Sequence, residues 1–159
     1  MKPNFHAQKL VLSKIYDYRI LNRHSASALD RRVLFYPKPL RWDLIREAVP
    51  LFLGEHDFKA FQNAKSAVQS SIRCLLSFEL FEDYKGLYRF RIEGTGFLKQ
   101  MVRTIMGTLL EIGEGKRDPK DVTKILASRD RRLAGRTVSG SGLCLVSVRY
   151  PLSFEQYRI

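Results

Sequence analysis

The composition of residues 9–21, and the alternation of hydrophobic and polar positions in their second half, predict a β-strand. The segment is rich in β-branched and aromatic residues, and from Tyr16 onward apolar side chains alternate with Asp17 and Arg19. A period of two places successive side chains on opposite faces of a sheet, so Tyr16 and Tyr18 share one face. The pattern indicates a half-buried strand that presents two phenol rings on the same side.

Other segments show either the same period or a helical one. Composition and alternation predict further strands at residues 33–36, 70–82, 87–93 and 143–150. Helices are expected from Asp43 toward Gly54, from Gly96 to about Ile112, and from about Pro119 to Ser128. The order β-β-α-β-β-α-α-β predicts an α+β fold, with a mixed, largely antiparallel sheet and helices packed on one face. No repeat or linker-like stretch interrupts the chain, so a single domain over residues 1–159 is expected.

A large excess of positive charge bears on the partner of this chain. Its 159 residues include 28 Lys and Arg against 16 Asp and Glu, a net charge of +12. Such a surface attracts polyanions, and each phosphate that it neutralises releases a counterion, so the charge favours RNA or DNA. A solubility surface and an acidic protein partner are the alternatives that charge alone leaves open.

Several other classes of protein do not fit the sequence. No apolar run approaches the ~20 residues that cross a bilayer, and we expect no signal peptide at the N-terminus. Cys74 and Cys144 lie far apart without Cys-x-x-Cys spacing, which favours reduced, buried thiols in a cytoplasmic protein. There is no Gly-x-Ser-x-Gly, no glycine loop ending in Gly-Lys-Ser/Thr and no His-Glu-x-x-His, and His6, His24 and His56 are scattered. We therefore expect these histidines to be surface or turn residues and not metal ligands.

The strand at residues 9–21 is the first candidate for an RNA contact. Tyr16 and Tyr18, with Lys14 two residues earlier, would offer rings on which a base stacks and a cation for the neighbouring phosphate. The same spacing suits a pair of core tyrosines whose hydroxyl groups reach the rim of the sheet. Spacing alone favours the core role.

The segment Gly94–Arg103 is the second candidate. Its glycines stand between a strand and a helix, where they allow the backbone to turn tightly and approach a ligand. Lys99 and Arg103 are four residues apart, so they share one flank of the predicted helix. A partly buried guanidinium there would need a carboxylate or a phosphate, whereas a surface arginine would extend into water. The spacing leaves both roles open.

A dispersed set of basic residues is the third candidate. Each alone is expected to be a solvated charge, but together they suit a phosphate-binding surface. The set comprises Arg19, Arg23, Arg31, Arg32, Lys65, Arg73, Arg89, Arg91, Lys116 and Arg117.

The segment Gly94–Gly113, with the sequence GTGFLKQMVRTIMGTLLEIG, closely resembles a signature of the tRNA pseudouridine synthase A family. Shorter family-like stretches occur in the same order along the chain. They are residues 5–7, 16–18, 54–58, Phe61, Arg73, 130–131, 142–145, Val148 and 150–151. The resemblance spans nearly the whole chain, and the long glycine-to-glycine motif is its most specific part.

The resemblance implies an enzyme that converts uridine to pseudouridine in the anticodon stem-loop of tRNA. Such an enzyme works as a homodimer, without a cofactor or a required metal. An aspartate attacks the nucleotide, the glycosidic bond breaks, and the base turns and re-attaches through carbon. The target uridine must leave its stack and enter a pocket for this chemistry.

Site residues follow from the same resemblance. Tyr16 matches the tyrosine that packs on the target uridine and helps proton transfer, and Arg103 matches the basic residue that pairs with the catalytic aspartate. Phe97 and Leu98 match apolar residues that line the pocket. The expected substrate contacts are completed by Tyr18, Lys99 and Arg73.

The chain also departs from the family pattern. The family's nucleophile lies in an Arg-Thr-Asp-Ala-Gly motif of the N-terminal half, and this sequence contains no such motif. We therefore expect a C-terminal, substrate-binding half that is inactive alone, with an edge strand and an apolar face exposed where the other half would meet it. An RNA-binding module that has lost the nucleophile is the alternative, and a basic structural protein of the ribosomal type is a third. Residues 137–141 replace a Thr-Ala-Pro-Ala-like loop of many relatives, which affects local contacts and not the fold.

Overall fold

The computed structural model describes residues 10–26 and 31–151, which form six strands and three α-helices. The strands are β1 (Ser13–Leu21), β2 (Leu34–Phe35), β3 (Gly54–Asp57), β4 (Ile72–Tyr84), β5 (Leu87–Gly94) and β6 (Leu143–Arg149). The helices are α1 (Trp42–Ala48), α2 (Met101–Gly113) and α3 (Asp121–Ser128). Short 3₁₀ turns connect several of these elements.

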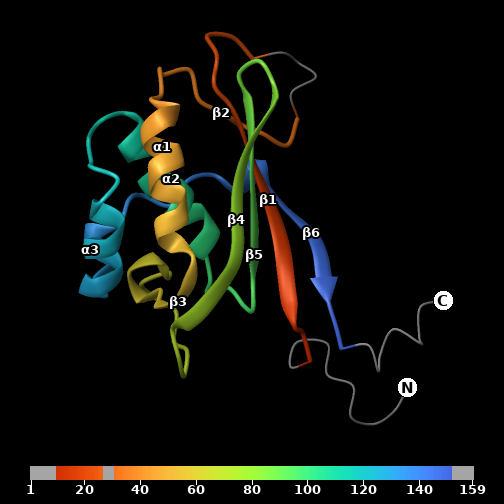
Figure 1. The fold of residues 1–159 in the computed structure, drawn as a ribbon, viewed down its shortest axis with the longest axis vertical. Coiled ribbons are helices and arrows are strands. Elements are labelled where there is room, and N and C mark those ends of the chain that lie inside the picture. The colour runs from red at the N-terminus through yellow and green to blue at the C-terminus, as the bar shows by residue number, and fades with distance from the viewer. Residues whose placement is uncertain (1–9, 27–30, 152–159) are drawn as a thin grey trace, which may run out of the picture.

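One sheet joins all six strands. Its order is β2-β1-β5-β4-β3, and β6 also pairs with β1 (Figure 1). One side of β1 pairs with β5 along its whole length, and the other side is shared by β6 at one end and β2 at the other. The pairing of β2 is parallel, and the other described pairings are antiparallel. Lys85 and Gly86 close the β4–β5 hairpin, where Gly86 has the positive φ of 83° that a tight turn demands.

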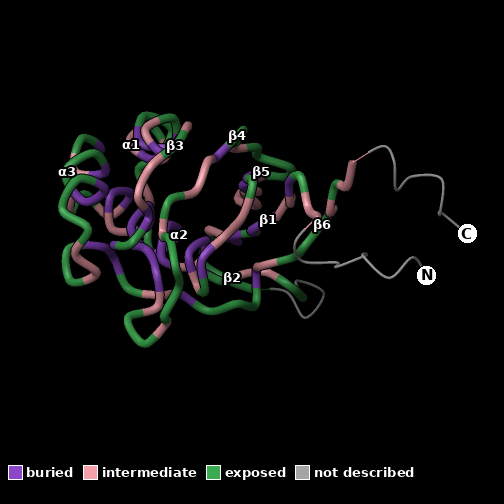
Figure 2. The backbone as a smooth tube through the Cα atoms, turned by 90° about the horizontal axis from the view of Figure 1, so that it is seen from below, coloured by how far each residue is buried: buried purple, intermediate pink, exposed green. Residues whose placement is uncertain are grey.

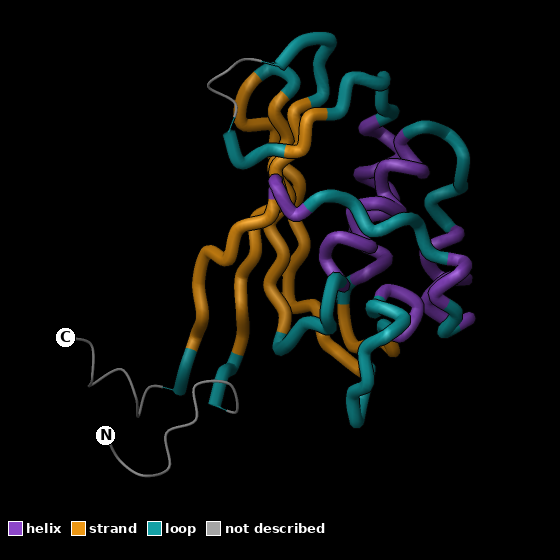
Figure 3. Tube along the Cα trace, turned by 180° about the vertical axis from the view of Figure 1, so that it is seen from behind, coloured by secondary structure: helices purple, strands orange, loops and turns teal. Residues whose placement is uncertain are grey.

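The three helices lie on one face of the sheet, with α1 packed on α2 (Figures 1 and 3). Buried segments concentrate where the helices and the sheet meet (Figure 2). The sheet contributes Tyr18, Phe90 and Ile92 to this core, and α2 contributes Met101 and Ile105, all with no exposed surface. Burial of apolar area between the two layers supplies the main driving force for this arrangement.

The α+β fold and the largely antiparallel sheet confirm the prediction from the sequence, but the bounds of two helices and the presence of β3 differ from it. The helix expected to reach Gly54 ends at Ala48 and continues as a 3₁₀ turn, Val49–Phe52, because Pro50 cannot donate a helical hydrogen bond. Gly54 then begins β3, a strand that the sequence pattern did not predict, with a φ of 90°.

The start of the long helix is also later than predicted. The helix expected from Gly96 begins at Met101. Gln100, just before it, has a left-handed φ of 63°, which a continuous helix cannot contain. Residues 95–100 therefore form a loop between β5 and α2.

Candidate functional site

Tyr16 and Phe97 form an aromatic pair beside the core. Tyr16 lies on β1 and Phe97 in the loop before α2; their ring centroids are 5.1 Å apart and their planes meet at 86°. Both residues are only partly buried, so part of the pair faces solvent. Burial raises the pKa of Tyr16 above 10.0, so its phenol is protonated at neutral pH and can donate a hydrogen bond.

Tyr18 lies on the same strand but belongs to the core. Its side chain is fully buried, and its hydroxyl donates a hydrogen bond of 2.5 Å to the carbonyl of Ser139. Burial raises its pKa to about 12, and the charge of Arg103 opposes this shift. In this structure Tyr18 therefore has the core role that the spacing favoured, and its ring offers no free face to a base.

Arg103 stands in the first turn of α2, half-buried beside the hydroxyl end of Tyr18. Its Nε donates a hydrogen bond of 2.6 Å to the carbonyl of Val138. Its side chain from Cδ to Cζ lies 3.9 to 4.0 Å from the point that a Cβ on Gly140 would occupy. Within residues 10–26 and 31–151, Arg103 has no carboxylate partner, and Nη1 and Nη2 have no protein acceptor. The guanidinium is thus held in place through Nε while its two outer nitrogens are available to an anion.

Polar contacts along α2 hold residues 135–139, the segment whose carbonyls bind Tyr18 and Arg103. The hydroxyl of Thr137 lies 3.0 Å from that of Thr104 and accepts a bond of 3.1 Å from Arg131. The first N–H of the segment donates to a threonine hydroxyl of α2 at 2.9 Å. These bonds fix the carbonyl groups that orient the site.

The remaining predicted contact residues occupy different positions around this site. Leu98 is almost fully buried and Lys99 is exposed. Arg73, on β4, donates to two carbonyls of the adjoining backbone at 2.8 and 2.7 Å. Its Cδ and Nε lie 3.3 Å from the point that a Cβ on Gly96 would occupy. The structure thus brings Arg73 against the loop that carries Phe97, and it places Leu98 beneath the surface.

Leu145 adds an apolar side chain that the sequence did not single out. It lies opposite Tyr16 in the register of β1 and β6 and is 48% exposed. Directly opposed residues of paired strands share one face, so Leu145 lies on the same side of the sheet as Tyr16. Its neighbours along β6 are apolar too, so alternation did not distinguish the two faces there.

On the other face of the sheet, acidic residues neutralise two of the arginines considered as RNA contacts. Arg91 makes two bonds of 2.8 Å with Asp17, and Arg89 bonds Asp83 at 2.8 and 3.0 Å. These bonds raise the pKa of both guanidinium groups. The guanidinium groups of Arg89 and Arg91 are therefore paired with carboxylates of the sheet. The sequence had placed both in a set of solvated charges that together suit a phosphate-binding surface.

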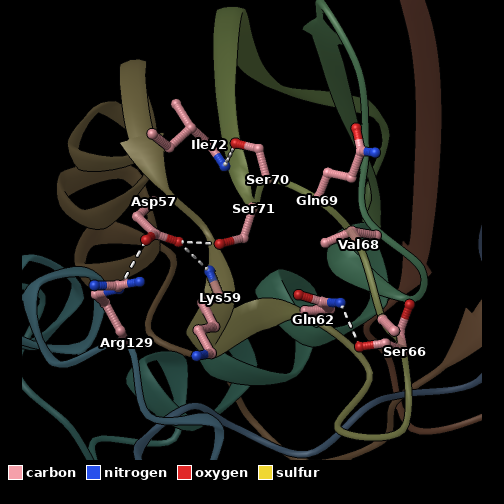
Figure 4. Close-up of a pocket in the computed structure, with 11 residues that line it drawn as sticks. Asp57, Lys59, Gln62, Ser66, Val68, Gln69, Ser70, Ser71, Ile72 and Arg129 are labelled. Carbon is pink, nitrogen blue, oxygen red and sulfur yellow. Dashed lines mark hydrogen bonds and ion pairs between the residues drawn. The ribbon is translucent and has the colours of Figure 1, made fainter.

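A cavity of about 410 Å³ lies apart from this site, between β3, residues 62–71 and the end of α3 (Figure 4). In it, Asp57 accepts bonds from the Ser71 hydroxyl at 2.6 Å and the Lys59 N–H at 3.0 Å, and pairs with Arg129 at 2.7 Å. The carboxylate is fully engaged by the protein, so Asp57 joins three segments of the fold.

The structure also bears on metal sites and membranes. In the part of the chain that it describes, no group of three His, Cys, Asp or Glu residues could hold a metal ion. His56 binds the carbonyl of Leu53 at 2.7 Å, and His6 lies outside the described residues. Over those same residues, none of the helices has the length and apolar character of a membrane span. The expectation of buried cysteines was wrong, because Cys144 is exposed and Cys74 is only partly buried.

Comparisons with known proteins give one consistent result. Residues 48–151 match a family model described as tRNA pseudouridine synthase. "tRNA pseudouridine synthase A 1" of Bacillus cereus (strain ATCC 10987 / NRS 248) is 43% identical over 147 residues, which cover 92% of this chain and 59% of the relative. "tRNA pseudouridine synthase A" of Clostridium acetobutylicum is 44% identical over 148 residues, which cover 92% of this chain and 60% of the relative. The chain therefore spans about three fifths of the length of these curated relatives.

Proposed function

Because the chain belongs to the tRNA pseudouridine synthase family, we propose that it holds a target uridine of tRNA beside Tyr16 and Arg103 for conversion to pseudouridine. The observation that carries this proposal is the state of Arg103. Its guanidinium is half-buried, bound through Nε alone, and without a carboxylate in the described residues. A guanidinium in this setting gains most from a carboxylate that accepts two parallel hydrogen bonds. We assign that carboxylate to a nucleophilic aspartate carried by a part of the enzyme outside this sequence.

The proposed reaction moves the glycosidic bond of uridine from nitrogen to carbon. The aspartate carboxylate attacks C1′ and displaces N1, which keeps the electron pair of the glycosidic bond, and the base turns. C5 of the base then attacks C1′ and releases the carboxylate, the proton on C5 is lost, and N1 gains a proton, so the product is an isomer of the substrate and the aspartate is regenerated. Arg103 would hold the aspartate as a carboxylate, which is its nucleophilic form.

Tyr16 suits the contact with the uridine. A base stacked on an aromatic ring gains about 1–3 kcal/mol, which offsets part of the few kcal/mol needed to unstack the nucleotide. Phe97 packs on the Tyr16 ring, and Leu145 adds an apolar side chain on the same side of the sheet. The raised pKa of Tyr16 suits it to pass on a proton through its hydroxyl and not to act as a phenolate.

Further features of the proposal come from the resemblance of the Gly94–Gly113 segment to the family. We propose that the substrate is the anticodon stem-loop of tRNA, that no cofactor takes part, and that the complete enzyme is a cytoplasmic homodimer. We propose that this chain is the single-domain, RNA-binding C-terminal half of such an enzyme and is inactive alone. The net charge of +12 supports the RNA-binding part of this assignment.

Reconstitution tests the proposal. The chain is combined with the segment of the Clostridium acetobutylicum relative that carries the family's Arg-Thr-Asp motif, and pseudouridine is measured by release of tritium from C5 of labelled uridine in tRNA. The chain alone should be inactive and the mixture active. In the mixture, Arg103→Ala should lower turnover about 100-fold or more, because an unpaired buried carboxylate costs about 3–5 kcal/mol. The control is Arg46→Ala, an exposed arginine on α1.

Each result bears on a different part of the proposal. Activity of the chain alone would end the assignment of the nucleophile to another segment. An inactive mixture that still binds tRNA would favour the non-catalytic RNA-binding module. Turnover by Arg103→Ala at the level of Arg46→Ala would end the assigned role of Arg103.

A further inference from the structure

One end of the sheet concentrates the positive charge of the molecule. Residues 19–26, 31–41 and 81–91 meet there, at the top of Figure 1. These segments contain nine basic and two acidic residues: Arg19, Arg23, Arg31, Arg32, Lys38, Arg41, Lys85, Arg89 and Arg91 against Glu82 and Asp83. Their excess of positive charge is more than half of the net +12 of the chain. Arg89 and Arg91 are already bonded to Asp83 and Asp17, so the charge that this end offers to a phosphate comes from the other basic residues of the set.

Asn22 ties these segments together. Its Nδ2 donates to the carbonyls of Tyr36 and Lys38, both at 2.7 Å, and its Oδ1 accepts from the Trp42 indole at 3.1 Å. Its backbone N–H donates to the carbonyl of Gly86 in the β4–β5 turn at 2.7 Å. The side chain of Asn22 thus binds residues 31–41 and the start of α1, and its backbone binds the β4–β5 turn, so the basic residues lie on an ordered surface.

Exposed aromatic residues lie among these cations. Tyr84, at the hairpin turn, is 75% exposed, and Phe35, on β2, is 38% exposed. The register places Phe35 next to Leu21, Leu21 next to Leu87, and Leu87 next to Tyr84, so the two aromatic residues end one row across four strands. Lys85 follows Tyr84 directly. Rings and cations in one place suit bases and phosphates together, whereas a solubility surface gains nothing from an exposed tyrosine.

We propose that this region, here called the hairpin end (residues 19–26, 31–41 and 81–91), is a second RNA-binding surface that contacts the same tRNA away from the target uridine. The inference rests on the proposed function, because it takes tRNA as the substrate. Leu21 lies five steps along β1 from Tyr16, a distance of about 17 Å at ~3.3 Å per residue. The hairpin end therefore reaches nucleotides well removed from the target. Lys85 and its basic neighbours neutralise phosphates, and a base or ribose rests on Tyr84.

Binding of a fluorescently labelled, unmodified tRNA transcript to the chain tests this surface, with affinity measured by anisotropy over a range of salt concentrations. Lys85→Glu should weaken binding about 10-fold near 0.1 M salt and reduce the slope of log K against log salt by about 1. Tyr84→Ala should weaken binding five-fold or more without changing the slope, because stacking is not a counterion effect. The matched control is Lys120→Glu, an equal charge change at an exposed residue next to α3, and circular dichroism checks that each variant is folded.

The outcomes separate this inference from the proposed function. If Lys85→Glu binds tRNA like Lys120→Glu, the hairpin end is not an RNA-binding surface, whatever the result of reconstitution. If Lys85→Glu weakens tRNA and heparin equally and Tyr84→Ala changes neither, the surface attracts any polyanion and the RNA assignment fails. Because no modification is measured, the expected losses would support the surface even if Arg103→Ala left turnover unchanged.

Discussion

Tyr16, Asp17 and Tyr18 are consecutive residues of β1, yet their surroundings assign them three different tasks. Tyr16 meets Phe97 at the edge of the core with part of its ring exposed. Asp17 points to the other face and is buried beneath Arg91, which it binds through both oxygens. Tyr18 is enclosed on the helical side. The depth at which each side chain lies, and not its type, separates substrate contact from structural support.

Removal of the hydroxyl group should affect turnover at Tyr16 and the free energy of unfolding at Tyr18. Tyr16→Phe should lower turnover of the reconstituted enzyme about 100-fold by removing its part in proton transfer, with little change in the free energy of unfolding. Tyr18→Phe should lower the free energy of unfolding by about 1–2 kcal/mol, because the Ser139 carbonyl loses its buried donor. Urea unfolding and tritium release measure the two effects. The reverse pattern, with Tyr16→Phe less stable and Tyr18→Phe inactive, would contradict the assignment.

The Asp57 carboxyl group should make the free energy of unfolding depend on pH. Burial acts to raise the pKa of its carboxyl group, but bonds from Ser71 and the Lys59 N–H and the charge of Arg129 outweigh it, so the pKa is lowered. A lowered carboxyl pKa stabilises the fold above the unfolded value of about 3.9, and this stabilisation is lost as the pH falls through the folded value. Asp57→Asn should therefore cost about 1–2 kcal/mol near pH 7 and almost nothing near pH 2.

Urea unfolding of the unsubstituted protein and of Asp57→Asn, near pH 7 and near pH 2, checks this dependence. Glu47→Gln, on the exposed side of α1, is the control and should change stability little at either pH. A loss of stability in Asp57→Asn that is as large in acid as at neutral pH would show that packing, and not charge, is the contribution of Asp57.

Among the elements, α2 and the segment 135–139 form the pair that builds the site. A Cβ on Gly107 would lie 1.8 Å from the carbonyl oxygen of Arg136, and one on Gly135 would lie 2.5 Å from a backbone nitrogen of α2. Only glycine permits this approach of two backbones. Contact at this distance places the Val138 carbonyl within reach of Arg103. Gly107 of α2 and Gly135 of the facing segment thus act on the site through packing.

Substitution of Gly107 and Gly113, both in α2, should have unequal effects on the free energy of unfolding. Gly107→Ala should lower the free energy of unfolding by about 3 kcal/mol, because the new methyl group meets rigid backbone. Gly113→Ala is the matched control in the same helix: its Cβ would lie 2.7 Å from the Ile45 Cδ1, the mobile end of a side chain that can shift. Thermal or urea unfolding of both variants checks the difference. Equal stabilities would show that residues 135–139 can move away from α2 at little cost.

At the scale of the whole molecule, the helices leave one face of the sheet uncovered in the described part of the chain, and β6 forms an edge. Among those residues, β6 pairs with β1 on one side and has no strand on the other. Leu145 and Val146 on this edge are 48% and 45% exposed. A strand with these features is suited to pairing with a further segment. The expectation that the other half of the enzyme meets the sheet here stays a prediction.

The net charge of the chain predicts that its affinity for tRNA depends strongly on salt concentration. Its affinity for unmodified tRNA should fall at least ~100-fold between about 50 and 200 mM salt, because several phosphates release counterions on binding. Anisotropy titrations at four or five salt concentrations measure the slope. An affinity that hardly changes with salt would mean that phosphate contacts contribute little, and it would count against both RNA-binding surfaces.

Several properties of this protein were determined by the sequence alone. Strand and helix periods predicted the α+β fold and the shared face of Tyr16 and Tyr18, because side-chain direction within one element depends on local backbone geometry. The count of charged residues predicts a polyanionic partner, because net charge depends on composition and requires no knowledge of contacts. The family-like segment Gly94–Gly113 indicated where to look for the site.

The tertiary structure decided which distant residues contact each side chain, because a local sequence pattern contains no information about them. The partner of the Arg103 Nε comes from Val138, 35 residues away, and that of Asp17 from Arg91, 74 residues away. Strand order and register also determined that Leu145 lies on the same side of the sheet as Tyr16. A local period reports which face a side chain takes, but its depth, its neighbours and the ion pair that claims its charge depend on which distant segments pack against that face.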